Sequence, residues 1–175
     1  MIQFEPITIK HLQYIRNIYN EYVKNTTVSF DVEPATIDKI KKLTMHGDER
    51  FCSYVIKDNN DVIGYVLLSP FIQKHACYGT AEVTIYLDVR YGRRGIGSRA
   101  LEFIEEQALA SGFHTLIAVI CTENESSIAA FTAKEYQMKG IIQQVAYKFD
   151  RYLDVCYYQK LLCKSSDKVV AKAHQ

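Results

Sequence analysis

The spacing of apolar residues along the chain alternates between helix-like and strand-like patterns. Leu12, Ile15, Ile18 and Tyr22 recur at helical spacing, so they predict an amphipathic helix after a first strand from Ile2 to Ile9. A polar segment with isolated apolar residues, Asn25 to Pro34, follows this helix. It is typical of an ordered loop, the kind of segment that often carries binding residues.

A short helix from Thr36 to about Met45 precedes three segments rich in β-branched and aromatic residues. Phe51 to Lys57 and Val62 to Ser69 flank turn-forming residues at positions 58–61, which predicts an antiparallel hairpin. In Ala81 to Val89 apolar and polar residues alternate, as in a strand with one buried face. We expect this third strand to lie beside the hairpin.

The centre of the chain has the pattern of a βαβ unit. Ile96 to Ala110 carries one apolar stripe, and Gly112 stands where a helix C-terminal cap is expected. His114 to Cys121 is almost entirely apolar and predicts a buried strand. A strand, a glycine-rich turn, a helix and a second strand predict a parallel pair with a right-handed connection.

The last third of the chain predicts a short helix and a closing pair of strands. The helix is expected from Ser126 to Ala133, and the antiparallel strands from Ile141 to Phe149 and from Leu153 to Leu162. The polar residues 164–175 are expected to form a frayed tail. The sequence thus predicts one α+β domain over residues 1–163, with a mixed, mostly antiparallel twisted sheet flanked by helices.

Composition excludes several function classes. The 175 residues contain 21 Lys and Arg against 20 Asp and Glu, so no overall field would recruit nucleic acid or an anionic membrane. No targeting or membrane-spanning pattern stands out, and we expect a soluble cytoplasmic protein. The five cysteines include no CxxC pair, so we expect reduced thiols and no metal site.

The candidate chemistry lies in the turn Arg90-Tyr91-Gly92-Arg93-Arg94-Gly95-Ile96-Gly97-Ser98. Gly95 and Gly97 stand between a predicted strand and a predicted helix, where backbone N–H groups lack helical partners and the helix dipole is positive. Glycine lets a ligand approach the backbone closely, and the arginines of this segment add cations. The turn therefore predicts a site for phosphate groups.

Two common phosphate-binding motifs fit this turn poorly. A dinucleotide-binding unit would be expected near the first strand, with an acidic residue at the end of the next strand. Here the unit lies in mid-chain and the next strand ends in Cys121-Thr122. No Gly-Lys-Ser/Thr follows the turn, so it is not a P-loop either.

Several segments, in order, resemble the GNAT superfamily of N-acetyltransferases. Tyr86 to Gly97 and Asn124 to Ile128 resemble the superfamily as a whole. Thr27 to Pro34, Ala81 to Tyr86 and Tyr147 to Val155 resemble its phosphinothricin or methionine-sulfoximine acetyltransferase branch. The resemblance covers residues 2–162, nearly the whole predicted domain.

The resemblance implies direct transfer of an acetyl group from acetyl-CoA to an amine, without a metal. In the family the strand before the turn pairs with pantetheine, the turn holds the pyrophosphate, and the later asparagine lies near the thiol. The cofactor-binding residues implied here are Leu87, Asp88, Val89, Gly92, Arg93, Arg94, Gly95, Ile96, Gly97, Ser98, Asn124 and Ser127.

Glu82 matches the family's catalytic glutamate. A partly desolvated carboxylate on a strand could remove the proton of a substrate ammonium. The pocket positions of the branch imply a separate set of substrate-binding residues, namely Phe30, Phe71, Lys74, Tyr86 and Tyr147.

Three residues depart from the family pattern. Phe131 has no proton to give a leaving thiolate, Glu135 replaces a glycine and suggests an altered turn, and Gly92 replaces a glutamine or arginine. Two alternatives stay open: the thiolate leaves unaided, or one of Cys121, Tyr86 and Tyr147 serves as the acid.

The leading hypothesis is an acetyltransferase acting on the amine of an amino acid or amino-acid analogue. One alternative is an acetyl-CoA-binding sensor with little turnover, which the departures at Gly92 and Phe131 favour. Another is a protein or peptide N-acetyltransferase, which would need an open groove. The tyrosine-rich closing strands could also supply the apolar interface of a homodimer.

Overall fold

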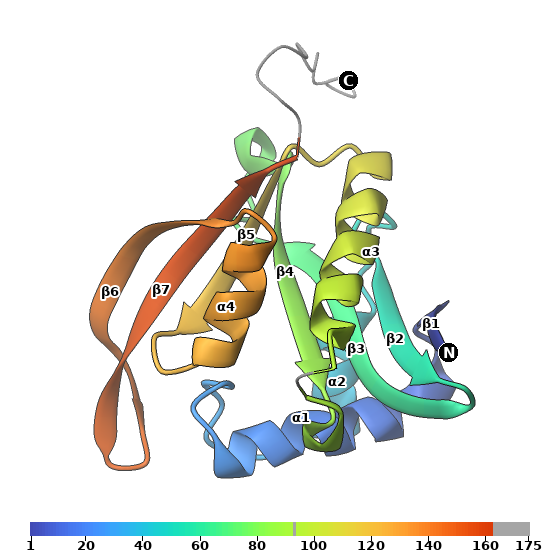
Figure 1. Ribbon diagram of the computed structural model, residues 1–175, viewed down its shortest axis with the longest axis horizontal. Helices are drawn as coiled ribbons and strands as arrows, with labels where there is room; N and C mark the ends of the chain where they lie inside the picture. The colour runs from blue at the N-terminus through green and yellow to red at the C-terminus, as the bar shows by residue number, and fades with distance from the viewer. Residues whose placement is uncertain (93, 163–175) are drawn as a thin grey trace.

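Within residues 1–92 and 94–162, which the computed structural model describes, seven strands form one sheet in the order β1-β2-β3-β4-β5-β7-β6 (Figure 1). All neighbouring strands are antiparallel except β4 and β5, which are parallel. The strands are β1 (Ile2–Pro6), β2 (Ser53–Asp58), β3 (Asp61–Pro70), β4 (Thr80–Leu87), β5 (Thr115–Cys121), β6 (Gln137–Lys148) and β7 (Arg151–Leu161).

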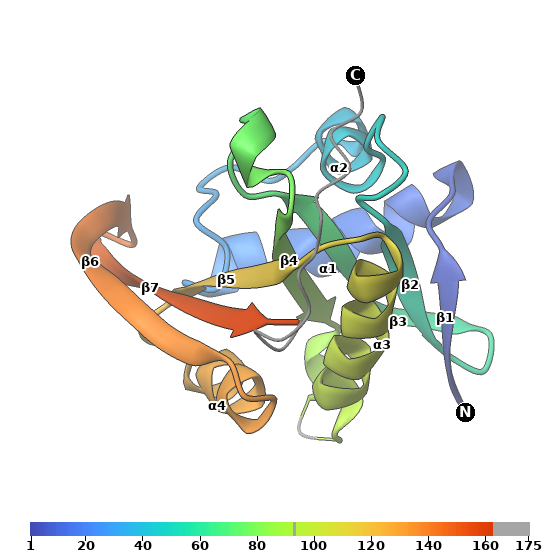
Figure 2. The same ribbon diagram turned by 90° about the horizontal axis from the view of Figure 1, so that it is seen from above.

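Helices cover both faces of the sheet. Seen from above, α1 and α2 lie on one side and α3 and α4 on the other (Figure 2). In the described part of the chain, three short 3-10 helices lie in the connections. The helices are α1 (Leu12–Asn25), α2 (Ile37–Thr44), α3 (Ile96–Ala110), α4 (Glu125–Ala133), η1 (Ile9–His11), η2 (His75–Cys77) and η3 (Val89–Tyr91).

The two faces bury separate apolar clusters. Beneath α3, the fully buried Leu101 and Ile104 pack with alternate residues of β3, β4 and β5. Beneath α1 and α2, the fully buried Ile15 and Ile40 pack on Val55 of β2 and on β3. Because burying one such side chain contributes roughly 1.5–3 kcal/mol, these clusters set which face of each strand points to which helices.

The predicted βαβ unit is confirmed. Helix α3 has the predicted bounds, and β4 and β5 are parallel. Gly112 adopts φ +81° just beyond the helix, and the Phe113 N–H donates to the Ala108 carbonyl at 2.9 Å. This is the Schellman arrangement that a glycine at this position predicts.

The ladder between β4 and β5 is short. It joins Thr80, Ala81 and Glu82 to residues 115–117, although β4 continues to Leu87 and β5 to Cys121. Beyond Glu82 the two strands diverge, as Figure 1 shows. The later part of β4 therefore has a backbone partner in β3 alone.

Some predicted boundaries are wrong. The first strand ends at Pro6 because the chain turns into η1, and β4 ends at Leu87 because Val89 begins η3. Strand β6 starts at Gln137, four residues before the predicted Ile141, because the polar side chains at its start hid a strand that pairs with β7. The predicted tail, 164–175, lies outside the described residues.

Two further observations concern the described part of the chain. Cys52, Cys77, Cys121 and Cys156 are free thiols, as predicted, and Cys163 lies outside the described residues. None of the helices in residues 1–92 and 94–162 is long and apolar enough to cross a membrane.

Candidate active site

The turn between β4 and α3 brings a left-handed glycine to the start of the helix. Gly95 is the N-cap of α3 and adopts φ +72°, a conformation that favours glycine. The Arg99 N–H donates to the Gly95 carbonyl at 3.2 Å. The N–H groups of Ile96, Gly97 and Ser98 precede this first helical bond, so they can serve a ligand.

This turn fits a phosphate-bearing cofactor. A Cβ added at Gly95 would meet no atom within 4 Å, and one added at Gly97 would meet only the Leu87 Cδ1 atom at 4.0 Å. The space around both glycines is therefore open at the start of the helix. Small residues, free donors and the positive helix end are the features that a pyrophosphate site requires.

The arginines of the turn differ in their surroundings. Arg90 forms an ion pair with Asp88, whose carboxylate accepts from the Arg90 Nη2 at 2.6 Å and from the Arg90 N–H at 3.0 Å. The Arg94 guanidinium lies 5.1 Å from the centre of the Tyr91 ring and is exposed. Arg93 lies outside the described residues. Asp88 therefore orients Arg90 and caps η3, and Arg94 is available to an anion.

The end of β4 offers backbone groups on its open side. The Asp88 N–H donates to the Ile63 carbonyl at 2.7 Å, and backbone groups alternate in direction along a strand. Val83, Ile85 and Leu87 therefore direct their N–H and C=O groups away from β3, toward the divergence of β4 and β5. The Tyr22 hydroxyl already donates to the Leu87 carbonyl at 2.6 Å, which places Tyr22, a residue that the sequence analysis missed, at this edge.

Glu82 stands where the β4–β5 ladder ends. It pairs with Ser69 of β3 and with Ile117 of β5. Its side chain points away from the α3 face, because its neighbours Ala81 and Val83 belong to the cluster beneath α3. Burial raises the pKa of the Glu82 carboxyl above its ordinary value. The carboxylate is therefore a stronger base than that of an exposed glutamate.

An aromatic contact spans the sheet on the same face. The Phe71 ring, just beyond β3, lies 6.4 Å from the ring of Tyr157 on β7, edge to face. Tyr157 lies opposite Val119 of β5, on the face away from α3. The contact links the end of β3 to β7 across β4, which carries Glu82, and β5. Lys74, predicted beside Phe71, is exposed.

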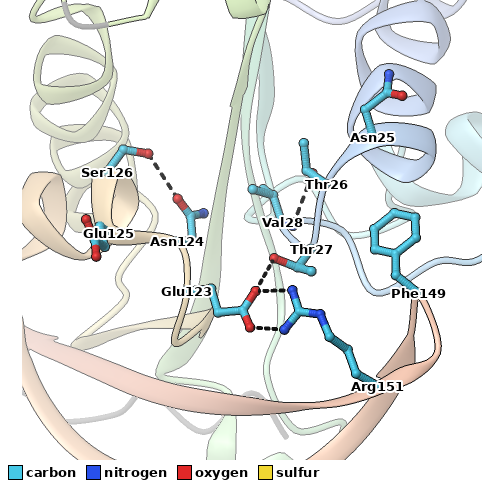
Figure 3. Close-up of a pocket in the computed structure, with 10 residues that line it drawn as sticks. All are labelled: Asn25, Thr26, Thr27, Val28, Glu123, Asn124, Glu125, Ser126, Phe149 and Arg151. Atoms are coloured by element: carbon cyan, nitrogen blue, oxygen red, sulfur yellow. Dashed lines mark hydrogen bonds and ion pairs between the residues drawn. The ribbon is translucent and has the colours of Figure 1, made fainter.

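A cavity of about 400 Å³ lies between three segments that are distant in the sequence (Figure 3). Glu123 joins them, because its carboxylate accepts from the Thr27 hydroxyl at 3.2 Å and from the Arg151 Nη2 at 2.8 Å. Arg151 holds the pKa of Glu123 below its ordinary value. The lining residues are Asn25, Thr26, Thr27, Val28, Glu123, Asn124, Glu125, Ser126, Phe149 and Arg151.

Asn124 and Ser127 are brought together at the start of α4. The Asn124 Oδ1 accepts from the Ser127 N–H at 3.2 Å, and its Nδ2 donates to the Ser127 Oγ at 2.8 Å. Asn124 is therefore the N-cap of α4. Asn124 also lines the cavity.

The other predicted substrate residues lie elsewhere. The Tyr86 ring packs against Tyr19, Tyr22 and Tyr65, with centroids 5.1–5.4 Å apart. Tyr147 is 56% exposed and lies edge to face with Tyr152 on the β6–β7 hairpin. Phe30 is partly buried in the loop after α1, beyond the segment that lines the cavity. These three residues are not among those lining the cavity.

Two of the three departures from the family pattern, Phe131 and Glu135, have structural explanations. Phe131 is 6% exposed, packs on Tyr136 beneath α4, and belongs to the core. The prediction that Glu135 alters the turn is wrong, because Glu135 adopts φ +65° as a glycine would. The Tyr136 N–H donates to the Phe131 carbonyl at 3.1 Å and the Glu135 N–H to the Thr132 carbonyl at 3.0 Å. These bonds make the same Schellman closure as at Gly112.

In the part of the chain described, residues 1–92 and 94–162, no three His, Cys, Asp or Glu side chains are grouped so that they could hold a metal ion.

Comparison with known proteins places these features in a family. Residues 15–136 match the acetyltransferase (GNAT) family. A phosphinothricin N-acetyltransferase of Streptomyces coelicolor is 30% identical over 92% of this chain and 96% of its own length. An L-methionine sulfoximine/L-methionine sulfone acetyltransferase of Pseudomonas aeruginosa is 28% identical over 86% of this chain and 89% of its own.

Solved structures agree with this assignment. A phosphinothricin acetyltransferase of the GNAT superfamily from Sinorhizobium meliloti, in complex with acetyl-CoA, superimposes with a TM-score of 0.86 at 26% identity. The superposition covers 91% of this chain and 88% of that one. The fold, the glycine turn and these matches lead to one conclusion: the chain belongs to the acetyltransferase (GNAT) family.

Proposed function

We propose that this GNAT acetyltransferase acetylates the primary amine of an amino acid or amino-acid analogue, with Glu82 as the base. The observation that carries the proposal is the place of Glu82, partly buried at the point where β4 and β5 diverge. The names of the relatives, which specify phosphinothricin and methionine sulfoximine, support the substrate class.

Backbone groups of the chain would bind the cofactor, and a side chain would accept the proton. The N–H groups at the start of α3 would bind the pyrophosphate, and the outward backbone groups of Val83 and Ile85 would align the pantetheine arm. Acetyl-CoA, when bound, supplies an activated thioester. Glu82 would take the proton of the acceptor ammonium, leaving a neutral amine that can attack the acetyl group. Because Phe131 lies in the core, we infer that the thiolate leaves without help from that position.

The cavity supports a small acceptor. Its volume of about 400 Å³ lies within the range of small-molecule sites, roughly 300–1,000 Å³. Glu123 and Arg151 place both charge signs on its wall, which suits an acceptor carrying an ammonium and a carboxylate.

A turnover assay tests the proposal. Purified protein is mixed with acetyl-CoA and with phosphinothricin, methionine sulfoximine, the common amino acids, and matched amines that lack a carboxylate, and free thiol is followed. We expect thiol release with one or more amino acids or analogues and less with the matched amines. Tight acetyl-CoA binding without release by any amine would favour a sensor, and acetylation of peptides alone would favour a protein acetyltransferase.

We also infer that the β6 edge of the sheet pairs with a second copy of the chain. Strand β6 has one neighbour, β7, and its Ile141 and Val145 are 50% and 53% exposed. A long apolar edge is a ready template for association. Light scattering should show a dimer that Ile141→Lys weakens, whereas a wild-type monomer at micromolar concentration would refute the inference.

A further inference from the structure

Lys148, at the end of β6, is a buried lysine with no role in the glycine turn or in the proton transfer proposed for Glu82. It is 4% exposed. Its Nζ donates to the Thr26 carbonyl at 2.8 Å and to the Ser29 carbonyl at 2.7 Å. These two acceptors lie 122 and 119 residues earlier in the chain, in the loop after α1. One ammonium thus fastens that loop to the hairpin.

Burying an ammonium group to hold a loop costs free energy. Removing a charge from water is costly unless hydrogen bonds compensate, and an apolar side chain of similar volume is often at least as stabilising. The Lys148 ammonium donates its two hydrogen bonds to carbonyls of one loop segment. This choice favours a role in fixing the shape of that segment over a role in general stability.

The loop is also held from its other side. The Ser29 hydroxyl donates to the Tyr19 Oη at 3.1 Å, and the Tyr19 hydroxyl donates to Asp31 at 2.7 Å. Asp31 in turn forms an ion pair with Lys39 at 2.5 Å. Helix α1 and Lys148 therefore hold the loop by hydrogen bonds from two sides, and these bonds restrict the conformation of its backbone.

Both structures that Lys148 touches line the cavity. Thr26, Thr27 and Val28 form one wall, and Phe149 of the hairpin tip belongs to another. The Lys148 Nζ lies 5.1 Å from the centre of the Phe149 ring, within reach of a cation–π contact. The side chain therefore fixes the separation of the two walls while lying outside the set that lines the cavity.

We propose that Lys148 is a positioning residue for the acceptor: it holds the 26–29 loop against the β6–β7 hairpin and so shapes the cavity that binds the amine. The inference rests on the proposed function, because it assigns this cavity to the acceptor. It predicts that loss of the ammonium weakens acceptor binding and leaves the cofactor turn between β4 and α3 unchanged.

The test compares Lys148→Met with a matched control. Lys160→Met makes the same change at a lysine of the neighbouring strand, whose Nζ contacts Glu105 at 2.6 Å and lies 5.6 Å from the Tyr136 ring. For K148M we expect the KM of the amine to rise roughly tenfold or more, because two charge-assisted bonds are lost. The Kd of acetyl-CoA should stay within about twofold, and K160M should keep the wild-type KM.

The outcomes separate this inference from the proposed function. If the wild-type enzyme acetylates none of the amines, the proposed function fails before any variant is compared. If the wild type turns over and K148M keeps its KM, or if K160M raises KM equally, the inference is wrong. Should K148M not fold, Lys148→Gln, which keeps a neutral donor, is judged by the same KM criterion. Failure of both to fold would also overturn the inference, since the ammonium would then serve the fold itself.

Discussion

The turn that we propose for the cofactor and the cavity that we propose for the acceptor are built in opposite ways. The turn is one continuous segment, from Leu87 to Ser98, and its shape follows from a left-handed glycine and the start of a helix. The cavity is assembled from the loop after α1, the β5–α4 connection and the β6–β7 hairpin. Its contacts join residues about a hundred positions apart, such as Thr27 with Glu123.

This difference indicates which region can change independently. A local turn keeps its geometry wherever strand, glycine and helix occur together, so one cofactor site can serve many acceptors. An assembled cavity depends on several side chains at once, so substitutions there are expected to be coupled. Cofactor binding should therefore tolerate changes at the cavity, and acceptor binding should be sensitive to them.

The largest effect is expected at Glu82, where the β4–β5 ladder ends. Glu82→Gln removes the base but keeps the size of the side chain, so kcat should fall by about 10²–10⁴-fold. The Kd of acetyl-CoA and the KM of the amine should change little. Steady-state kinetics and calorimetry measure these values, with Glu106→Gln, an exposed change on α3, as the control.

The pH dependence sharpens the same prediction. A base acts when deprotonated, and burial raises the pKa of Glu82. The kcat/KM of the wild type should therefore fall as the pH drops through this raised pKa, and the acid limb should disappear in E82Q. An unchanged limb in E82Q, or wild-type kcat in that variant, would assign the base elsewhere.

A change at the cofactor turn should have an intermediate effect. Gly95→Ala forces a β-carbon into a left-handed conformation, at a cost of about 1–3 kcal/mol. We expect the added carbon to hinder the approach of the cofactor to the N–H groups at the start of α3, so the Kd of acetyl-CoA should rise roughly tenfold.

Gly112→Ala is the matched control, because Gly112 has φ +81° at the other end of α3. It should lower the melting temperature about as much as G95A while leaving the Kd unchanged. Equal losses of affinity in the two variants would mean that backbone strain alone explains the effect of G95A, without any hindrance at the N–H groups that begin α3.

The smallest effect is expected at the ion pair of the cavity wall. Arg151 and Glu123 are about half exposed, and such pairs contribute about 0–1 kcal/mol to stability. Arg151→Gln should therefore leave the melting temperature nearly unchanged but raise the amine KM roughly threefold, because Glu123, which also accepts from Thr27, loses its ion-pair partner. Lys134→Gln, which breaks another surface pair with Glu102, should alter neither quantity. A wild-type KM in R151Q would remove this pair from the acceptor site.

Sequence periodicity predicted the elements well where local pattern and tertiary packing agree. The bounds of α3, the parallel pairing of β4 and β5, and the closing hairpin follow from apolar spacing and turn residues. The family pattern misled at Glu135, where the replacement of a glycine predicts an altered turn. The two bonds that close α4 hold Glu135 in the left-handed conformation, so packing outweighs its local preference.

The site could be predicted only in part for the same reason. Glu82 and the glycine turn were found from motifs that are continuous in the chain. Tyr22, Tyr157 and Lys148 were missed because their partners lie far away in the sequence, and a buried lysine at the end of a polar strand looks like any exposed one. No spacing rule links Lys148 to Thr26.

The sequence by itself determined the family, the order of most elements and the glycine turn between β4 and α3, because each depends on residues within about one turn or strand of one another. Tertiary structure decided the proposed acceptor cavity: which loop meets which hairpin, and which charges are buried between them. Those contacts form only when the sheet brings distant segments together, and the free energy that selects them comes from burial of the whole core, which no single segment encodes.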